Sequence, residues 1–243
     1  QLSEQGRDQL EGPLRIGAIH TVGPYLFPDL VPALVEQAPK MQLAIEENFT
    51  AALTEKLKNG DLDIILIAEP YSEPGIQTRA LYSEPFVALL PAGHALAEKA
   101  VLDTTDLAHE TVLLLGSGHC FRDQVLEFCP ECRRQTSLLG NAIQNSIEGG
   151  SLETIRYMVA SGLGITILPC TATAVEKFSQ RLVTVLPFEN KQPSRTIALA
   201  WRKSFPRQEA VELIASTISN NLPSCVTPYE AASRIESTAR ASS

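Results

Sequence analysis

The feature that most constrains this fold is the alternation of apolar strands and helices in the first 70 residues. Apolar strands are predicted over 14–19 and 62–67, and runs of this kind are typical of strands buried on both faces of a parallel sheet. Helices predicted over 25–36 and 51–58 flank a third strand at 42–46. Because parallel strands joined by helices need right-handed crossovers, this order predicts a doubly wound α/β sheet.

Proline, threonine and glycine set the expected helix boundaries. Pro24 suits a first helical turn. Pro28 and Pro32 each cost about 3 kcal/mol in a helix interior, so Pro28 fits best near the first turn and Pro32 is expected to kink the helix. Thr50 is the expected N-cap of the helix over 51–58, and Gly60 follows that helix as its left-handed stop.

A second α/β unit is predicted to begin near residue 83. With 243 residues, 44% of them hydrophobic, the chain can bury one large core or two small ones. The segment 130–150 lacks periodicity and is expected to be a loop, and the polar tail from Pro223 is expected to fray. Strands are predicted at 85–90, 111–115, 165–169 and 195–201, and helices from Cys120 onward, over 151–160 and over 208–219.

The segment 116–124, with the sequence GSGHCFRDQ, places a cysteine at a predicted helix start. Apolar residues from Phe121 onward recur at helical spacing, so Cys120 falls in the first turn. There it faces unpaired backbone N–H groups and the positive end of the helix dipole, which favour the thiolate. His119 and Arg122 would act in the same direction. Cys120 is therefore a candidate peroxide-reactive thiol, although a small buried hydrophobic residue is the alternative.

A second cysteine, Cys129, follows at a spacing that conflicts with a helix. Nine helical residues place the two Cα atoms about 13 Å apart, whereas a disulfide needs them within about 7 Å. Either the helix is absent, or forming a bond between Cys120 and Cys129 destroys it. In the second case oxidation becomes a change of shape, which a switch requires.

Composition excludes several classes of protein. No run approaches 18 apolar residues, so no membrane span is expected, and the first residues lack the pattern of a signal peptide. Five cysteines, an odd number, do not form a secreted disulfide framework. We therefore expect free thiols in a reducing, cytoplasmic setting, with no role for Cys170 or Cys225. The net charge of −8 argues against direct binding of nucleic acid by this chain itself, because such binding needs a basic surface.

Several motifs together resemble a known family. The segments 57–64, 91–97 and 159–169 look like the effector-binding half of LysR-type transcriptional regulators. The segments 19–26 and 118–129 are similar to the peroxide-sensing members of that family. The resemblance covers roughly residues 10–222, and the segment with two cysteines is its specific part.

The resemblance implies two doubly wound α/β subdomains joined by crossing strands, as in periplasmic binding proteins. Residues 1–12 would be the end of a linker from a winged helix-turn-helix DNA-binding domain, which this chain lacks. Subdomain I would comprise 13–83 with 196–222, subdomain II 84–195 with the redox cysteines, and 223–243 a flexible tail.

The resemblance also implies a chemistry. Cys120 would react with hydrogen peroxide and Cys129 would resolve the product as a disulfide, in a sensor that is no enzyme and needs neither cofactor nor metal. A glutaredoxin-type reductant would reset it. The implied peroxide-binding residues are Thr21, Thr50, His119 and Arg122. The chain departs from the family at Cys132, which leaves open which thiol resolves the oxidised Cys120.

The implied partners follow from the same resemblance. A homodimer is expected, becoming a tetramer in the intact protein, which would contact DNA only through the N-terminal domain. It would control the transcription of oxidative-stress genes, as an activator or as a repressor.

Two other functions stay open at this point. His119, Cys120, Cys129 and Cys132 offer four soft ligands for a metal sensor, although an adjacent His and Cys rarely both reach one tetrahedral ion. Alternatively, the cleft between the subdomains binds a small organic effector.

Overall fold

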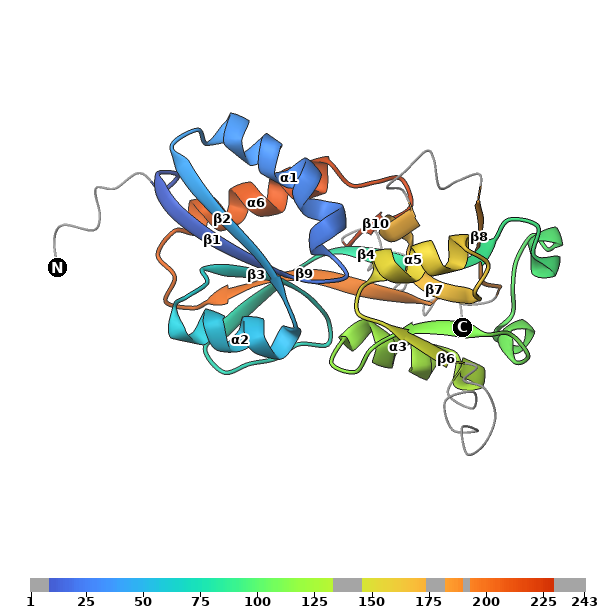
Figure 1. Ribbon diagram of the computed structural model, residues 1–243. Helices are drawn as coiled ribbons and strands as arrows, with labels where there is room; N and C mark the ends of the chain where they lie inside the picture. The colour runs from blue at the N-terminus through green and yellow to red at the C-terminus, as the bar shows by residue number, and fades with distance from the viewer. Residues whose placement is uncertain (1–8, 133–145, 174–181, 190–192, 230–243) are drawn as a thin grey trace, which may run out of the picture. The chain divides into compact units, whose positions relative to one another are not determined.

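The computed structural model describes residues 9–132, 146–173, 182–189 and 193–229. Its contacts divide the chain into two units. One runs to Ser83 and resumes at Thr196, and the other is Glu84–Arg195. The long strands β4 (Ile76–Pro91) and β9 (Ser194–Arg202) contribute residues to both units (Figure 1).

The first unit has the doubly wound sheet that the sequence predicts. Its strands β1 (Gly12–Ile19), β2 (Met41–Asn48) and β3 (Ile64–Ala68) run in the order β2-β1-β3-β9. Strand β1 is parallel to β2 and β3, whereas β9 is antiparallel to β3. Because the crossovers from β1 to β2 and from β2 to β3 run in opposite directions, right-handed connections place their helices on opposite faces. Those helices are α1 (Gly23–Gln37) and α2 (Thr50–Asn59), and α6 (Gln208–Asn220) packs beside α1 (Figure 1).

The core of this unit is the centre of that sheet. All five residues of β3 are buried, which is the environment predicted for a mostly apolar strand. At Gly17 in β1, an added Cβ would lie 2.6 Å from Leu53 Cδ2 and 2.7 Å from Leu62 Cδ1. A larger residue at this position would force α2 away from the sheet, so glycine is needed here for close packing.

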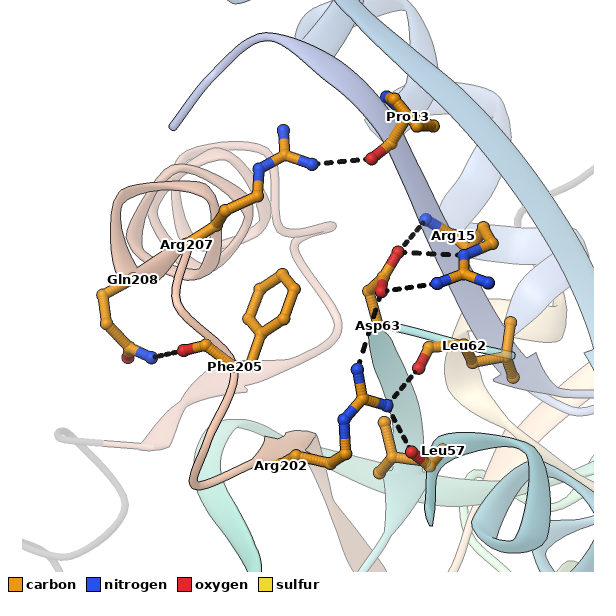
Figure 2. Close-up of polar contacts among 9 residues, drawn as sticks. All are labelled: Pro13, Arg15, Leu57, Leu62, Asp63, Arg202, Phe205, Arg207 and Gln208. Atoms are coloured by element: carbon orange, nitrogen blue, oxygen red, sulfur yellow. Dashed lines mark hydrogen bonds and ion pairs between the residues drawn. The ribbon is translucent and has the colours of Figure 1, made fainter. Parts of the chain in front are cut away.

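One carboxylate ties the strands together at the edge of this core (Figure 2). Asp63 accepts hydrogen bonds from the backbone N–H of Arg15 at 2.8 Å and from its guanidinium at 3.0 and 3.2 Å. Arg202 Nη2 lies 3.7 Å from the same carboxylate. Arg202 also donates to the carbonyls of Leu57 and Leu62, so β1, β3, β9 and the end of α2 share one polar junction.

The second unit repeats the α/β pattern around another parallel core. Strand β5 lies between β6 and β7 and is parallel to both, while β4 pairs antiparallel with β7 and β8. The elements are β5 (Val112–Leu115), α3 (Cys120–Phe128), β6 (Ser146–Gly149), α5 (Leu152–Ala160), β7 (Ile165–Pro169) and β8 (Val183–Pro187), with short 3₁₀ turns at Ala95–Glu98, Thr104–Leu107 and Cys170–Thr173. Both helices pack on β5.

Most predicted helix boundaries are confirmed, and one cap is wrong. Gly60 has φ of 82° and ends α2 in the left-handed conformation, and Pro24 lies in the first turn of α1. Helix α1 continues through Pro28 and Pro32. Thr50 does not cap α2: the N-cap is Phe49, and Thr50 is already helical, its carbonyl accepting from the Thr54 hydroxyl at 2.8 Å. A threonine inside the first turn cannot cap that turn.

Three strand predictions differ from the structure. Strand β4 is 16 residues long and begins at Ile76, where local apolar patterning gives no signal. It lies beside β9 in the sheet, and its Tyr82 and Ser83 pair with β10 (Thr227–Pro228). That pairing also orders part of the tail that was expected to fray. Within the expected loop over 130–150, Ser146–Gly149 forms β6, and 133–145 lies outside the described residues. In the described segments, no helix is both long and apolar enough to cross a membrane.

Candidate functional site

The reactive segment sits at the carboxyl end of β5. Glycine residues carry the chain from β5 into α3, and Gly118 has φ of 97°, a conformation that L side chains rarely adopt. His119 is the N-cap residue and is 7% exposed. Cys120 is therefore the first residue of α3, as the sequence predicts, and is partly exposed. Its position places it among the backbone N–H groups that have no partner within the helix.

Arg122 fixes the turn before this cysteine. Its Nη1 donates to the carbonyl of Leu115 at 2.6 Å and lies 2.7 Å from Glu148 Oε1. The guanidinium thus joins the end of β5 to β6 across the start of α3. Leu115 is seven residues before Arg122, whereas Glu148 is distant in sequence and could not be identified from the local pattern around Cys120.

The buried face of α3 packs on an ion pair that is fully enclosed. Phe121 meets Phe86 edge-on with ring centroids 5.0 Å apart, and the guanidinium carbon of Arg195 lies 5.0 Å from the Phe121 ring centroid. Arg195 Nε and Glu84 Oε2 are 2.9 Å apart, with both side chains 0% exposed. Thr171 also donates to Glu84. Glu84 gives only a weak signal in sequence, a single acid beside an apolar strand.

The far end of α3 carries two buried thiols. Cys129 is the C-cap residue, and both it and Cys132 are 0% exposed. A hydrogen bond from the Cys132 thiol is the main cause that lowers the pKa of Cys129, and the same contact raises the pKa of Cys132. Backbone N–H groups of Cys132 and Glu131 act in the same direction on Cys129. The pair therefore favours charge on Cys129 and a proton on Cys132.

The oxidation states of the cysteines only partly match expectation. Cys120, Cys129 and Cys132 are free, as predicted. Cys170 and Cys225 are instead disulfide-bonded, so the prediction of free thiols is wrong for these two. A count of cysteines along the chain does not show which ones tertiary structure pairs.

The two threonines of the predicted site belong to the first unit. Ile19 and Asn48 are paired neighbours at the ends of β1 and β2, and Thr21 and Thr50 each follow by two residues. Thr21 is 2% exposed and Thr50 is half-buried. The two strands therefore place both hydroxyl-bearing residues at one edge of that sheet.

The predicted metal ligands do not gather into one site. Within residues 9–132, 146–173, 182–189 and 193–229, no group of three or more His, Cys, Asp or Glu side chains is arranged to hold an ion. Cys120 and Cys129 stand at opposite ends of a nine-residue helix, which separates the four candidate ligands.

Comparison with known proteins identifies the family. Residues 7–222 match the model of the LysR substrate binding domain. The DNA-binding transcriptional dual regulator OxyR of Escherichia coli K12 is 35% identical over 218 residues, which are 90% of this chain and 69% of that protein. The chain belongs to the OxyR group of the LysR substrate-binding domain family.

Solved OxyR structures share this fold. The reduced OxyR regulatory domain of Pseudomonas aeruginosa is 48% identical, with a TM-score of 0.78 over 87% of this chain and 99% of that one. A cysteine mutant of Corynebacterium glutamicum OxyR, described as H2O2-bound, is 29% identical, with a TM-score of 0.74 over 87% of this chain and 65% of that one.

Proposed function

We propose that this chain is the hydrogen-peroxide-sensing domain of a transcriptional regulator, in which peroxide oxidises Cys120 and Cys129 resolves the product as a disulfide. The observation that carries the proposal is helix α3, which begins at Cys120 and is capped by Cys129, with both thiols free. Membership of the OxyR group supports it, as does the peroxide named for the Corynebacterium relative.

The chemistry needs only the two thiols and peroxide. The Cys120 thiolate attacks one oxygen of H2O2, the O–O bond breaks, and the leaving hydroxide takes a proton to become water. Cys120 then carries a sulfenic acid. The Cys129 thiolate attacks the Cys120 sulfur and expels a second hydroxide, which is protonated to water, leaving a disulfide. Backbone N–H groups at the start of α3 stabilise the first thiolate.

Hydrogen-bond donors would bind peroxide and stabilise charge on its leaving oxygen. Thr21 and Thr50 offer hydroxyls, and His119 a ring N–H, from positions that the family resemblance implies. The contribution of Arg122 is positional, because its guanidinium is engaged by Leu115 and Glu148 and holds the turn that presents Cys120.

Disulfide formation would convert oxidation into a conformational change. Helix α3 keeps the two Cα atoms roughly 13 Å apart, beyond the reach of about 7 Å that a disulfide allows. Cys129 and Phe121 are also buried. The bond therefore forms only if α3 unwinds and a buried thiol leaves its place, which is the two-state element that a switch requires.

A rapid-quench experiment tests this function. The reduced chain is mixed with equimolar peroxide for seconds, quenched, and mapped by peptide mass spectrometry without reductant. We expect the Cys120–Cys129 crosslink in the wild type and none in Cys120→Ser. In Cys129→Ser, dimedone should trap a sulfenic acid at Cys120. Oxidation of Cys120 no faster than that of free cysteine would contradict peroxide sensing and favour a small organic effector.

The same proposal includes the working context of the domain. As in a LysR-type regulator, DNA would be bound by an N-terminal domain, and copies would pair as dimers and form tetramers at full length. The domain would act in the cytoplasm as a sensor that consumes one peroxide per cycle rather than as an enzyme. A glutaredoxin-type dithiol would reduce the disulfide and reset it.

A further inference from the structure

Cys132 is a third thiol near the proposed redox pair, and a backbone turn holds it close to Cys129. The N–H of Cys132 donates to the carbonyl of Cys129 at 3.1 Å, closing a turn of the kind that holds its end Cα atoms within about 7 Å. That is the separation a disulfide needs. A hydrogen bond already joins the two thiols. Because only two residues intervene, the pair stays close whether or not α3 is folded.

The two possible bonds of Cys129 therefore differ in what they demand of the fold. A bond to Cys120 requires the nine helical residues of α3 to unwind. It also requires Phe121 to lose its contacts with Phe86 and Arg195. A bond to Cys132 requires none of this. Both thiols are buried, and a hydrogen bond and a backbone turn already join the two residues, so the second bond is compatible with a folded α3.

We propose that Cys132 takes over the disulfide from Cys120, so that oxidised chains pass from a Cys120–Cys129 bond to a Cys129–Cys132 bond. This rests on the proposed function. The Cys132 thiol loses its proton to water, the resulting thiolate attacks Cys129 Sγ, and the Cys120–Cys129 bond breaks to release Cys120 as a thiolate. The exchange involves no net oxidation, because peroxide has already removed the two electrons.

Charge within the pair sets the order of these events. In the reduced chain the hydrogen bond to Cys129 raises the pKa of Cys132, so Cys129 is the thiol that attacks first. Once Cys129 is in a disulfide it no longer holds negative charge, and this cause of the raised pKa of Cys132 is gone. The consequence is a self-limiting signal: α3 refolds with Cys120 restored while Cys129–Cys132 stays oxidised.

Tryptic mapping separates the two bonds cleanly. Cleavage after Arg122 and Arg133 leaves Cys129 and Cys132 in one peptide and Cys120 in the preceding one. In a peroxide time course on the whole chain, the crosslink between the two peptides should appear first and then decay as the single peptide loses two hydrogens. In Cys132→Ser, which keeps a hydrogen-bond donor, the crosslink should live longer by about ten-fold or more. Equal lifetimes in the two proteins would overturn the proposal.

A second measurement does not depend on peroxide reacting at Cys120. The Cys120→Ser chain is equilibrated in glutathione redox buffers, and the internal disulfide of the 123–133 peptide is followed, with Cys120→Ser/Cys129→Ser as the control. Formation of the bond in the first variant alone supports the role of Cys132 as a disulfide partner of Cys129. If the bond forms but peroxide fails to oxidise Cys120 in the wild type, the proposed function fails while this pairing stands. No bond at any buffer ratio overturns the role of Cys132.

Discussion

At the scale of single residues, Asp63 shows how one carboxylate serves several segments. It directly precedes the buried strand β3, is 7% exposed, and takes hydrogen bonds from both the backbone and the guanidinium of Arg15. The contact raises the pKa of Arg15, with the hydrogen bond as the first cause. A buried acid next to an apolar strand is tolerated because its oxygens accept hydrogen bonds.

Replacing Asp63 by alanine should therefore destabilise the chain. We expect a loss of roughly 1.5–3 kcal/mol in the free energy of unfolding, because the N–H of Arg15 loses a charged acceptor. Urea unfolding followed by circular dichroism measures this change. Asp63→Asn is the matched control and should lose less, since its amide oxygen still accepts from the backbone. Equal losses in both variants would show that charge, not hydrogen bonding, dominates.

At the scale of elements, three apolar side chains pack helix α3 into its unit: Phe121 and Val125 are buried, and Phe128 meets Phe188 edge-on with ring centroids 5.0 Å apart. Phe121 packs on Phe86 and under the guanidinium of Arg195, which is itself neutralised by Glu84. Because the proposed disulfide requires α3 to unwind, these contacts oppose the switch. Packing of Phe121 thus favours the folded helix, whereas formation of the disulfide favours the unwound one.

Weakening that packing should speed the switch. In Phe121→Leu, the step from sulfenic acid to the Cys120–Cys129 disulfide should be several-fold faster, and the reduced chain should lose about 1–2 kcal/mol of stability. Rapid quench gives the rate and urea unfolding gives the stability. Phe27→Leu, at a similarly buried position in α1, should lose stability without changing the rate. A rate unchanged in Phe121→Leu would refute unwinding of α3 as the slow step.

At the scale of the whole molecule, the chain forms two units with separate cores. The first is built around β1 and β3, and the second around β5 and β7. The proposed redox thiols Cys120 and Cys129 both belong to the second unit. Rearrangement of α3 therefore begins in one core and need not break the other.

Hydrogen exchange should reveal this division. We compare peroxide-oxidised and reduced chains by exchange mass spectrometry, in Cys132→Ser so that the first disulfide persists. Amides of α3 should lose protection by about ten-fold or more, because their helical hydrogen bonds are broken. Amides of β1 and β3 should be unchanged. A uniform loss across both units would instead indicate global destabilisation.

Local pattern was sufficient for much of the fold and part of the site. The alternation of strands and helices, the left-handed stop at Gly60 and the helix starting at Cys120 all follow from residues close in sequence. Hydrophobic periodicity and turn chemistry act over a few residues, so a single sequence reports them. The conflict between the Cys120–Cys129 spacing and a helix is of the same local kind.

Other features depend on which distant segments meet. The first half of β4 carries no apolar run, and in the sheet β4 lies beside β9 and pairs with β10, where Ser83 meets Thr227, 144 residues away. Arg122 is engaged by Glu148, and Arg195 is buried against Glu84. Such contacts are decided by packing and by satisfying charge in the folded chain, which local periodicity does not encode. The sequence alone thus determined the elements and the position of the reactive cysteine, and only the tertiary structure decided what holds that cysteine's helix in place.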